Sequence, residues 1–289
     1  MDDLTTYAYH IGRILKVLVY IEEHLDEELP LEKMAKIASI SPFYFHRLFH
    51  AYMGETLAEY VKRLRLQRAK ERLQYSDSPI TEIALDLGYE NPSAFTKVFQ
   101  QILGQSPRQY RKMMQPLMQS IMRRTTPNAN EKAMLKPEYI NRKAETILFV
   151  RKVGDYKETP TIAFQVLVQF LEDKKITKEK INAYYCMGLD DPHTVERSKC
   201  RFDACVALKE ATCPQGEVGQ RSIPGGRCAV FTHRGPYSEI ERALEDIFRL
   251  WYPTAQEELA DASQFCELLN PWDAIPDEER ITKIYIPLK

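Results

Sequence analysis

Two short helical patterns, separated by a tight turn, occupy residues 80–110. Apolar residues recur at i, i+3, i+4 and i+7 over 80–87, which predicts one buried helical face. Gly88 follows, where the end of a helix favours a residue that tolerates positive φ. Asn91 and Pro92 then supply a cap and a first-turn proline for a second helix. Two short helices joined in this way are typical of a helix-turn-helix.

The same pattern occurs 50 residues upstream, so the sequence predicts two helix-turn-helix units. A helical pattern without a breaker, residues 56–75, connects them. Twenty residues at about 1.5 Å each give a rod of about 30 Å. One turn of B-DNA is about 34 Å long, so one chain can place two recognition helices in successive major grooves. The matching positions are Pro92, Phe95, Phe99 and Gly104 in the second unit and Pro42, Phe45, Phe49 and Gly54 in the first.

The polar face of each second helix is predicted to read DNA. Arg47 and Lys97 stand at equivalent positions and can donate hydrogen bonds to guanine or to phosphate. Thr96 can contact a thymine methyl group, and His46 can bond a base edge. The alternative for each helix is an ordinary solvated face. The predicted DNA-contacting residues are Phe43, His46, Arg47, His50, Ser93, Thr96 and Lys97, with Arg63 and Arg65 of the connecting helix on phosphates.

Charge and composition indicate which kinds of partner the chain can bind. The net charge is −1, but residues 41–124 carry 13 Lys and Arg against 7 Asp and Glu, so the basic excess is local. No apolar run reaches the length of a membrane span, and the first residues do not form a secretion signal. We therefore expect a cytoplasmic protein with no membrane partner. All six cysteines lie in the second half without C-x-x-C spacing, which predicts free thiols and neither a metal site nor a cofactor.

The second half has alternating strand and helix patterns, which are typical of an α+β domain, and it contains a repeat of its own. Gly-x-Tyr-x-Glu occurs at 154–158 and again at 235–239, each time before a helical pattern and two strands. The predicted fold is thus multidomain: an all-α double helix-turn-helix domain over 8–114, a linker over 115–133, and a tandem βαββ domain over 134–289.

A seam between two such repeats is a natural place for a small-molecule site. The second repeat carries Glu267 where the first carries Met187, among apolar neighbours. Aromatic walls with one carboxylate favour cationic or amphipathic ligands. On a strand, however, Glu267 can equally face solvent, and each aromatic can equally be core. The predicted ligand-binding residues are Glu267, Tyr156, Tyr185, Tyr237, Trp251 and Trp272.

Two family resemblances follow from these motifs. IALDLGY followed by NPSAFTKVFQQILGQSPRQYR resembles the signature of the AraC family of bacterial transcription regulators, which implies seven helices and two DNA-reading helices. Gly-Pro-Tyr at 235–237, the glutamate at 267 and the terminal IYIPLK resemble the GyrI-like effector-binding domain, whose relatives place that glutamate in a ligand pocket. The order of the two domains is similar to the Rob-type branch of the family.

Together these features predict a ligand-responsive transcription regulator rather than an enzyme. The expected partners are double-stranded DNA, a small hydrophobic or cationic effector, and RNA polymerase. Pro92 and the short Ser93 reach less far than Phe43 and His46, so the first unit is expected to provide most of the sequence discrimination. The alternatives are a GyrI-like domain that acts as a small-molecule hydrolase or as a protein-docking module.

Overall fold

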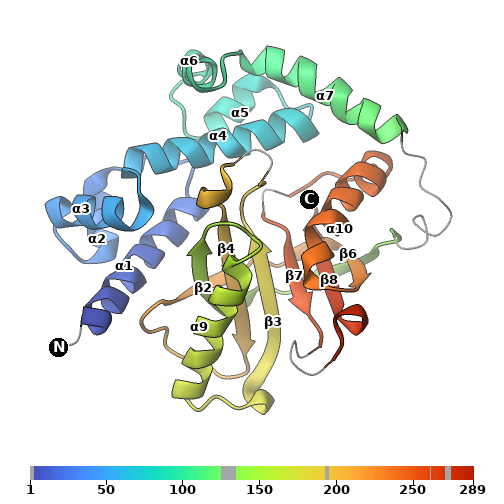
Figure 1. Cartoon of the computed structure of the whole chain (residues 1–289). Helices are drawn as coiled ribbons and strands as arrows, with labels where there is room; N and C mark the ends of the chain where they lie inside the picture. The colour runs from blue at the N-terminus through green and yellow to red at the C-terminus, as the bar shows by residue number, and fades with distance from the viewer. Residues whose placement is uncertain (1–2, 125–134, 193–194, 261, 271–274) are drawn as a thin grey trace. The chain divides into compact units, whose positions relative to one another are not determined.

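The computed structural model describes residues 3–124, 135–192, 195–260, 262–270 and 275–289. The chain forms two compact units, residues 1–124 and 125–289, and each is described by itself. Figure 1 shows the first as helices and the second as a sheet with helices.

The described part of the N-terminal unit contains seven helices, as the resemblance implied. Helices α2 and α3 form the first helix-turn-helix, α5 and α6 form the second, and α4 connects them. The helices are α1 (Asp3–Glu23), α2 (Leu31–Ala38), α3 (Pro42–Met53), α4 (Leu57–Tyr75), α5 (Ile80–Asp86), α6 (Pro92–Leu103) and α7 (Pro107–Arg124).

The two units have equivalent local structure, which confirms the predicted repeat. A side-chain oxygen caps each second helix, from Ser41 on α3 and from Asn91 on α6. Gly54 and Gly104 end these helices with φ of 68° and 70°. The phenylalanines at the four repeat positions are fully buried: Phe45, Phe49, Phe95 and Phe99. Ile102, on the same helix as Phe95 and Phe99, is 44% exposed.

Helix α4 is held at its start and along its length. Thr56 and Glu59 form a capping box, in which each side chain bonds the other residue's backbone amide. Tyr60, Ala69 and Leu73 of α4 are fully buried. Nineteen residues give α4 a length of about 28 Å, close to the predicted rod.

Arg65 of α4 ties the first part of the N-terminal unit to the second. Its Nε donates to the Leu25 carbonyl oxygen at 2.9 Å, and its Nη2 donates to that of Glu27 at 2.7 Å. Gly88, in the turn of the second helix-turn-helix, has φ of 70° and packs against this same backbone. A Cβ at residue 88 would lie 2.7 Å from the Asp26 carbonyl oxygen and 2.5 Å from Arg65 Nη2. We call Arg65, its carbonyl partners and Gly88 the arginine clamp.

Helix α7 corrects the predicted domain boundary. Its start is capped by Ser106, whose hydroxyl accepts from the Gln109 amide. The helix then continues to Arg124, with Pro116 inside it. The linker predicted from residue 115 therefore begins inside a helix, although an interior proline removes one backbone hydrogen bond and clashes with the carbonyl four residues earlier.

The C-terminal unit is built on one eight-stranded antiparallel sheet in the order β1-β6-β8-β7-β3-β4-β2-β5. The predicted βαββ order occurs twice, as β2-α9-β3-β4 and β6-α10-β7-β8, while β1 and β5 are additional edge strands. The elements are β1 (Glu138–Arg142), β2 (Glu145–Val153), α9 (Thr159–Asp173), β3 (Ile181–Gly188), β4 (Arg201–Leu208), β5 (Val218–Ile223), β6 (Gly226–Arg234), α10 (Ile240–Asp246), β7 (Phe265–Leu268) and β8 (Ile281–Pro287).

The two repeats meet at β3 and β7, where Cys186 faces Cys266 across the pair. The strand order is symmetric about this pair: β3, β4 and β2 follow one another on one side, and their counterparts β7, β8 and β6 do so on the other. Both helices cover the same face of the sheet (Figure 1). That face holds the main core, including Leu167 and Phe170 of α9 and Trp251, just after α10. Because side chains alternate along a strand, Tyr185 and Glu267 must point to the opposite face from these cysteines.

Replacing Gly88 by alanine should destabilise the protein more than the same change at Gly54. Both residues have φ near 70°, which costs alanine about 1 kcal/mol. Gly54 has no atom within 4 Å of its missing Cβ, whereas Gly88 packs on backbone, which adds about 1–3 kcal/mol. Urea unfolding followed by far-UV circular dichroism measures the difference. Equal losses in the two variants would show that the close packing at Gly88 is unimportant.

Candidate functional site

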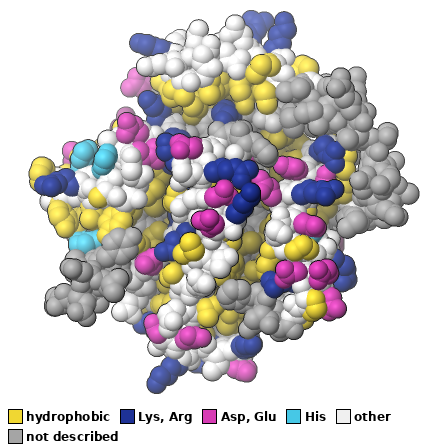
Figure 2. All heavy atoms as spheres, in the orientation of Figure 1, with side chains coloured by type: hydrophobic (Ala, Val, Ile, Leu, Met, Phe, Trp, Pro, Cys, Tyr) yellow, Lys and Arg dark blue, Asp and Glu magenta, His cyan; other side chains and the backbone are white. Residues whose placement is uncertain are grey.

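The outer face of α3 presents the predicted side chains to solvent. Phe43 is 73% exposed, and His46, Arg47 and His50 are exposed as well. The Arg47 guanidinium lies 5.8 Å from the Phe43 ring centroid, so the ring can steady the arginine by a cation–π contact. In Figure 2 the region of α3 shows histidine, basic and hydrophobic side chains together.

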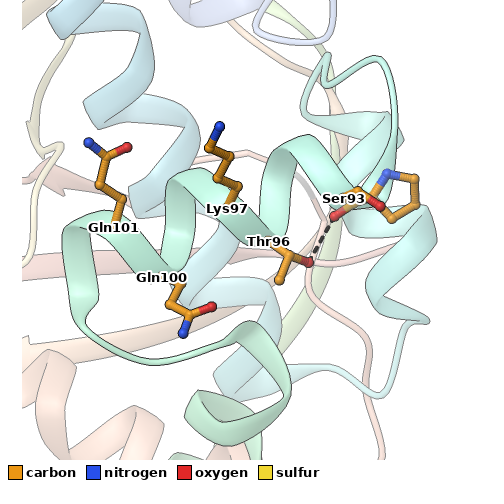
Figure 3. Close-up of a pocket in the computed structure, with 6 residues that line it drawn as sticks. Ser93, Thr96, Lys97, Gln100 and Gln101 are labelled. Atoms are coloured by element: carbon orange, nitrogen blue, oxygen red, sulfur yellow. Dashed lines mark hydrogen bonds between the residues drawn. The ribbon is translucent and has the colours of Figure 1, made fainter.

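Helix α6 has an equivalent outer face with shorter side chains (Figure 3). Ser93 and Lys97 are exposed, and Thr96 is half-buried. The Thr96 hydroxyl donates to the Pro92 carbonyl oxygen at 2.8 Å, which leaves its methyl group for an apolar contact. A shallow depression follows this face, lined by Pro92, Ser93, Thr96, Lys97, Gln100 and Gln101.

The two arginines predicted to contact phosphate have partners inside the N-terminal unit. Arg63 forms an ion pair with Glu55, with Nη2 and Oε1 at 2.6 Å, and its guanidinium lies over the Tyr60 ring. Arg65 belongs to the arginine clamp, where burial lowers its pKa. Both side chains therefore brace α4 rather than extend from it. Lys62 of the same helix is exposed and is the better candidate for a phosphate contact.

Three of the predicted ligand-binding aromatics lie away from Glu267. Trp251 packs in the helix-side core, with its ring centroid 4.9 Å from that of Phe231. The Tyr156 hydroxyl lies 2.9 Å and 3.0 Å from the carbonyl oxygens of Asp190 and Arg201, between which its one hydrogen is shared, so it fastens loops instead of lining a pocket. The Tyr237 ring lies under the Arg280 guanidinium at 4.6 Å. Trp272 lies outside the described residues. These assignments followed the sequence repeat and the helical pattern after it, neither of which shows on which face of the sheet a side chain lies.

Tyr185 and Glu267 do lie together. They are direct neighbours across β3 and β7, on the sheet face opposite the helices. Two further rings join them on that face. Phe265 is stacked on Tyr285 with centroids 4.6 Å apart, and it meets Tyr185 edge-on at 5.9 Å. The Tyr285 hydroxyl donates to Glu267. We call Tyr185, Phe265 and Tyr285 the aromatic cage.

A cation of the chain itself occupies the aromatic cage. The Arg142 guanidinium lies 4.8 Å from the ring centroid of Phe265 and 5.8 Å from those of Tyr185 and Tyr285. Its Nη2 donates to Glu145 at 3.1 Å, and the Tyr185 hydroxyl donates to the same carboxylate oxygen at 2.7 Å. Arg142 Nη1 is buried without a hydrogen-bond partner, a situation that costs about 1–3 kcal/mol.

Two carboxylates flank the cage, and they affect its tyrosines. Burial raises the pKa of Tyr185, and the neighbouring Glu145 raises it further. Burial also raises the pKa of Tyr285, with Glu267 adding to the effect. Both phenols therefore stay neutral and act as hydrogen-bond donors to the carboxylates. The arrangement offers aromatic faces and negative charge, which suits an organic cation.

Sequence reasoning missed Phe265, Tyr285, Arg142 and Glu145 as site residues. Phe265 could have been found, because it stands two positions before Glu267 on one strand and so shares its face. Tyr285 becomes visible only when β7 is known to pair with β8. Arg142 and Glu145 come from the β1–β2 hairpin, whose strand β1 the sequence pattern did not predict. No local signal points to them.

These features define a two-domain protein with a double helix-turn-helix followed by a tandem βαββ domain. Residues 34–113 match the model of a helix-turn-helix domain family, and residues 135–289 match that of the GyrI-like small molecule binding domain. The chain belongs to the AraC family of regulators that carry a C-terminal GyrI-like small molecule binding domain.

Relatives match the N-terminal part. The regulatory protein SoxS of Escherichia coli K12 is 34% identical over 102 residues, which span 35% of this chain and 95% of SoxS. The regulatory protein PocR of Salmonella typhimurium LT2 is 40% identical over 102 residues, but the match spans only 34% of PocR. A crystal structure of the AdpA DNA-binding domain with a target DNA aligns at 29% identity and a TM-score of 0.34, over 35% of this chain and 92% of that one. Within the described residues, no helix is long and apolar enough to cross a membrane.

Replacing Arg65 and Lys62 by glutamine should separate stability from DNA contact. Arg65→Gln removes charge-assisted bonds of the arginine clamp and should lower the free energy of unfolding by about 1.5–3 kcal/mol. Lys62→Gln should change stability by less than about 0.5 kcal/mol. It should, however, reduce the slope of log affinity for DNA against log salt by about 1. If Arg65→Gln reduced that slope without destabilising the protein, Arg65 would be a phosphate contact after all.

Proposed function

We propose that this chain is a transcription regulator that binds double-stranded DNA through both helix-turn-helix units. Its C-terminal domain takes a small hydrophobic or cationic effector that controls the regulator. The observation that carries the proposal is the pair of equivalent helices α3 and α6, each with a buried phenylalanine face and an exposed polar face. The match to regulators over the same residues supports it.

The two helix-turn-helix units are proposed to contribute unequally to base recognition. On α3, Arg47 has the reach for guanine O6 and N7, and Phe43 steadies it at the start of the helix. On α6, Lys97 is exposed, but Ser93 is short and the Thr96 hydroxyl is already bonded to the helix backbone. We therefore assign most base discrimination to α3. His46 and His50 of α3, and Ser93 and the Thr96 methyl of α6, complete the proposed contacts.

The effector part of the proposal rests on Glu267 and the aromatic cage. Three ring centroids lie within 6 Å of one cation, and the Glu267 carboxylate accepts a hydrogen bond from the neutral phenol of Tyr285. A bound organic cation would gain both the ring faces and this carboxylate. Tyr185 stays in the proposed site, whereas Tyr156, Tyr237 and Trp251 take structural roles.

The match spans only about a third of the length of two of the relatives, PocR and the Bacillus subtilis regulator YbfP. The activity of the whole protein is therefore proposed from the residues of this chain. Contact with RNA polymerase and a cytoplasmic location stay predictions. An effector regulates DNA binding only when it binds one state of the protein better than another.

The two alternative functions receive less support. A hydrolase would need an activated base or nucleophile, but burial and Glu267 raise the pKa of Tyr285 and keep it a neutral phenol. A protein-docking module predicts buried aromatics and no ligand pocket. The rings are indeed buried, but a charged guanidinium lies within 6 Å of all three ring centroids, which a simple apolar core would not contain.

Replacing Arg47 by alanine should weaken specific DNA binding by about 1–3 kcal/mol, because a base-edge contact is lost. Fluorescence anisotropy on a duplex selected by the wild-type protein measures the effect. Binding to an unrelated duplex should fall much less. Lys16→Ala, which alters an exposed lysine of α1, is the matched control and should leave specificity unchanged. Wild-type discrimination by Arg47→Ala would exclude this residue from base recognition.

Replacing Glu267 by glutamine should weaken binding of the organic cation tetraphenylphosphonium by about 1–2 kcal/mol, or roughly five- to thirtyfold. Glutamine keeps an oxygen that can accept from Tyr285 but removes the charge. Isothermal titration calorimetry measures the change. Glu210→Gln, at an exposed carboxylate of the same domain, is the control and should bind like wild type. Equal affinity in all three proteins would remove Glu267 from the effector site.

A further inference from the structure

Arg142 holds the place that an organic cation would take in the aromatic cage. Its guanidinium is within 6 Å of three ring centroids, and its side chain is only 11% exposed. The family resemblance and the match to a small-molecule domain say nothing about such an occupant. Arg142 is the last residue of the edge strand β1.

The guanidinium is incompletely satisfied in this place. One nitrogen, Nη2, donates to Glu145, while Nη1 is buried without a hydrogen-bond partner. Glu267, the second carboxylate of the cage, bonds Tyr285 instead of Arg142. A cation of different shape can therefore reach a negative group that Arg142 does not use.

The backbone of Arg142 is held in place independently of its side chain. Arg142 pairs with Gly226 in the ladder of β1 and β6. Gly225 packs against the same hairpin, so closely that a Cβ there would lie 3.1 Å from the Arg142 carbonyl oxygen and 2.7 Å from the Ala144 amide nitrogen. Lys143 and Ala144, which follow in the turn, are exposed. Rotation of the long arginine side chain toward this solvent-exposed turn requires no change of strand register.

We infer that Arg142 is an internal competitor for the aromatic cage, which an organic cation must expel in order to bind. The inference rests on the proposed function, because it takes the cage as the effector site. Arg142 then sets the affinity threshold of the site. Weakly bound cations fail to displace it, and cations that also reach Glu267 succeed. The apparent dissociation constant equals the intrinsic one divided by the fraction of protein whose cage Arg142 has left.

Replacing Arg142 by alanine tests the competition directly in the full-length protein. Calorimetric titration with tetraphenylphosphonium should show at least tenfold tighter binding than wild type. Arg227→Ala is the matched control, because Arg227 also lies over a tyrosine, Tyr139 at 5.2 Å, but pairs with Glu257 at the surface. This control should bind like wild type. Unchanged or weaker binding by Arg142→Ala would overturn the inference.

A second measurement uses a replacement for the missing group. Methylguanidinium should bind to Arg142→Ala and compete there with tetraphenylphosphonium, whereas wild type should ignore it at the same concentration. If the alanine variant does not fold, Arg142→Gln repeats the titration with an uncharged chain and the same expected direction. Failure of methylguanidinium to compete in the variant would contradict the internal competitor.

The outcomes separate this inference from the proposed function. If Glu267→Gln weakens tetraphenylphosphonium binding but Arg142→Ala does not tighten it, the cage is the effector site and Arg142 is not a competitor. If wild type and Arg142→Ala both fail to bind tetraphenylphosphonium, the proposed effector site itself is wrong, and the inference falls with it.

Discussion

The arginine clamp is the contact on which the spacing of the two helix-turn-helix units depends. Arg65 stands near the middle of α4 and donates to carbonyl oxygens of Leu25 and Glu27, just before α2. Gly88, in the turn between α5 and α6, packs on the same atoms. One guanidinium thus meets both units at the centre of the connecting helix. A protein that places two recognition helices in successive major grooves needs this rigidity, because a shift of either helix would move it out of register with its groove.

The C-terminal domain depends instead on a symmetric fold whose side chains are not symmetric. Equivalent positions in the repeats hold Tyr185 and Phe265, so each half contributes a ring beside the seam. The next equivalent pair differs: Met187 is apolar and its counterpart Glu267 is charged. Strand pairing keeps these positions together, while the change of residue type gives the cage its negative side.

Sequence periodicity revealed the elements and the repeats, because buried faces impose spacings of 3.6 and 2 that survive in the residues. Of the five aromatics that the sequence grouped with Glu267, Tyr185 is its direct neighbour across β3 and β7. Periodicity could not show that Arg63 and Arg65 turn inward, since a long basic side chain at the border of an apolar stripe reaches either solvent or a neighbouring carbonyl. Nor could it bring Arg142 to the cage, because that contact requires the pairing of β1 with β6 and of β6 with β8, which joins residues far apart in the chain.

The Arg142 guanidinium already occupies the aromatic cage. The affinity of any effector therefore depends on the difference in free energy between the cage filled by the effector and the cage filled by Arg142. Rings that contact a new cation lose their contact with Arg142, so the cation–π energy of about 0.5–2 kcal/mol per contact largely cancels. What does not cancel is the charge of Glu267, which Arg142 leaves to Tyr285, and the buried Nη1, which gains water when the side chain leaves. Selectivity in this site therefore follows from the groups that the internal cation fails to satisfy, and only secondarily from the rings that surround it.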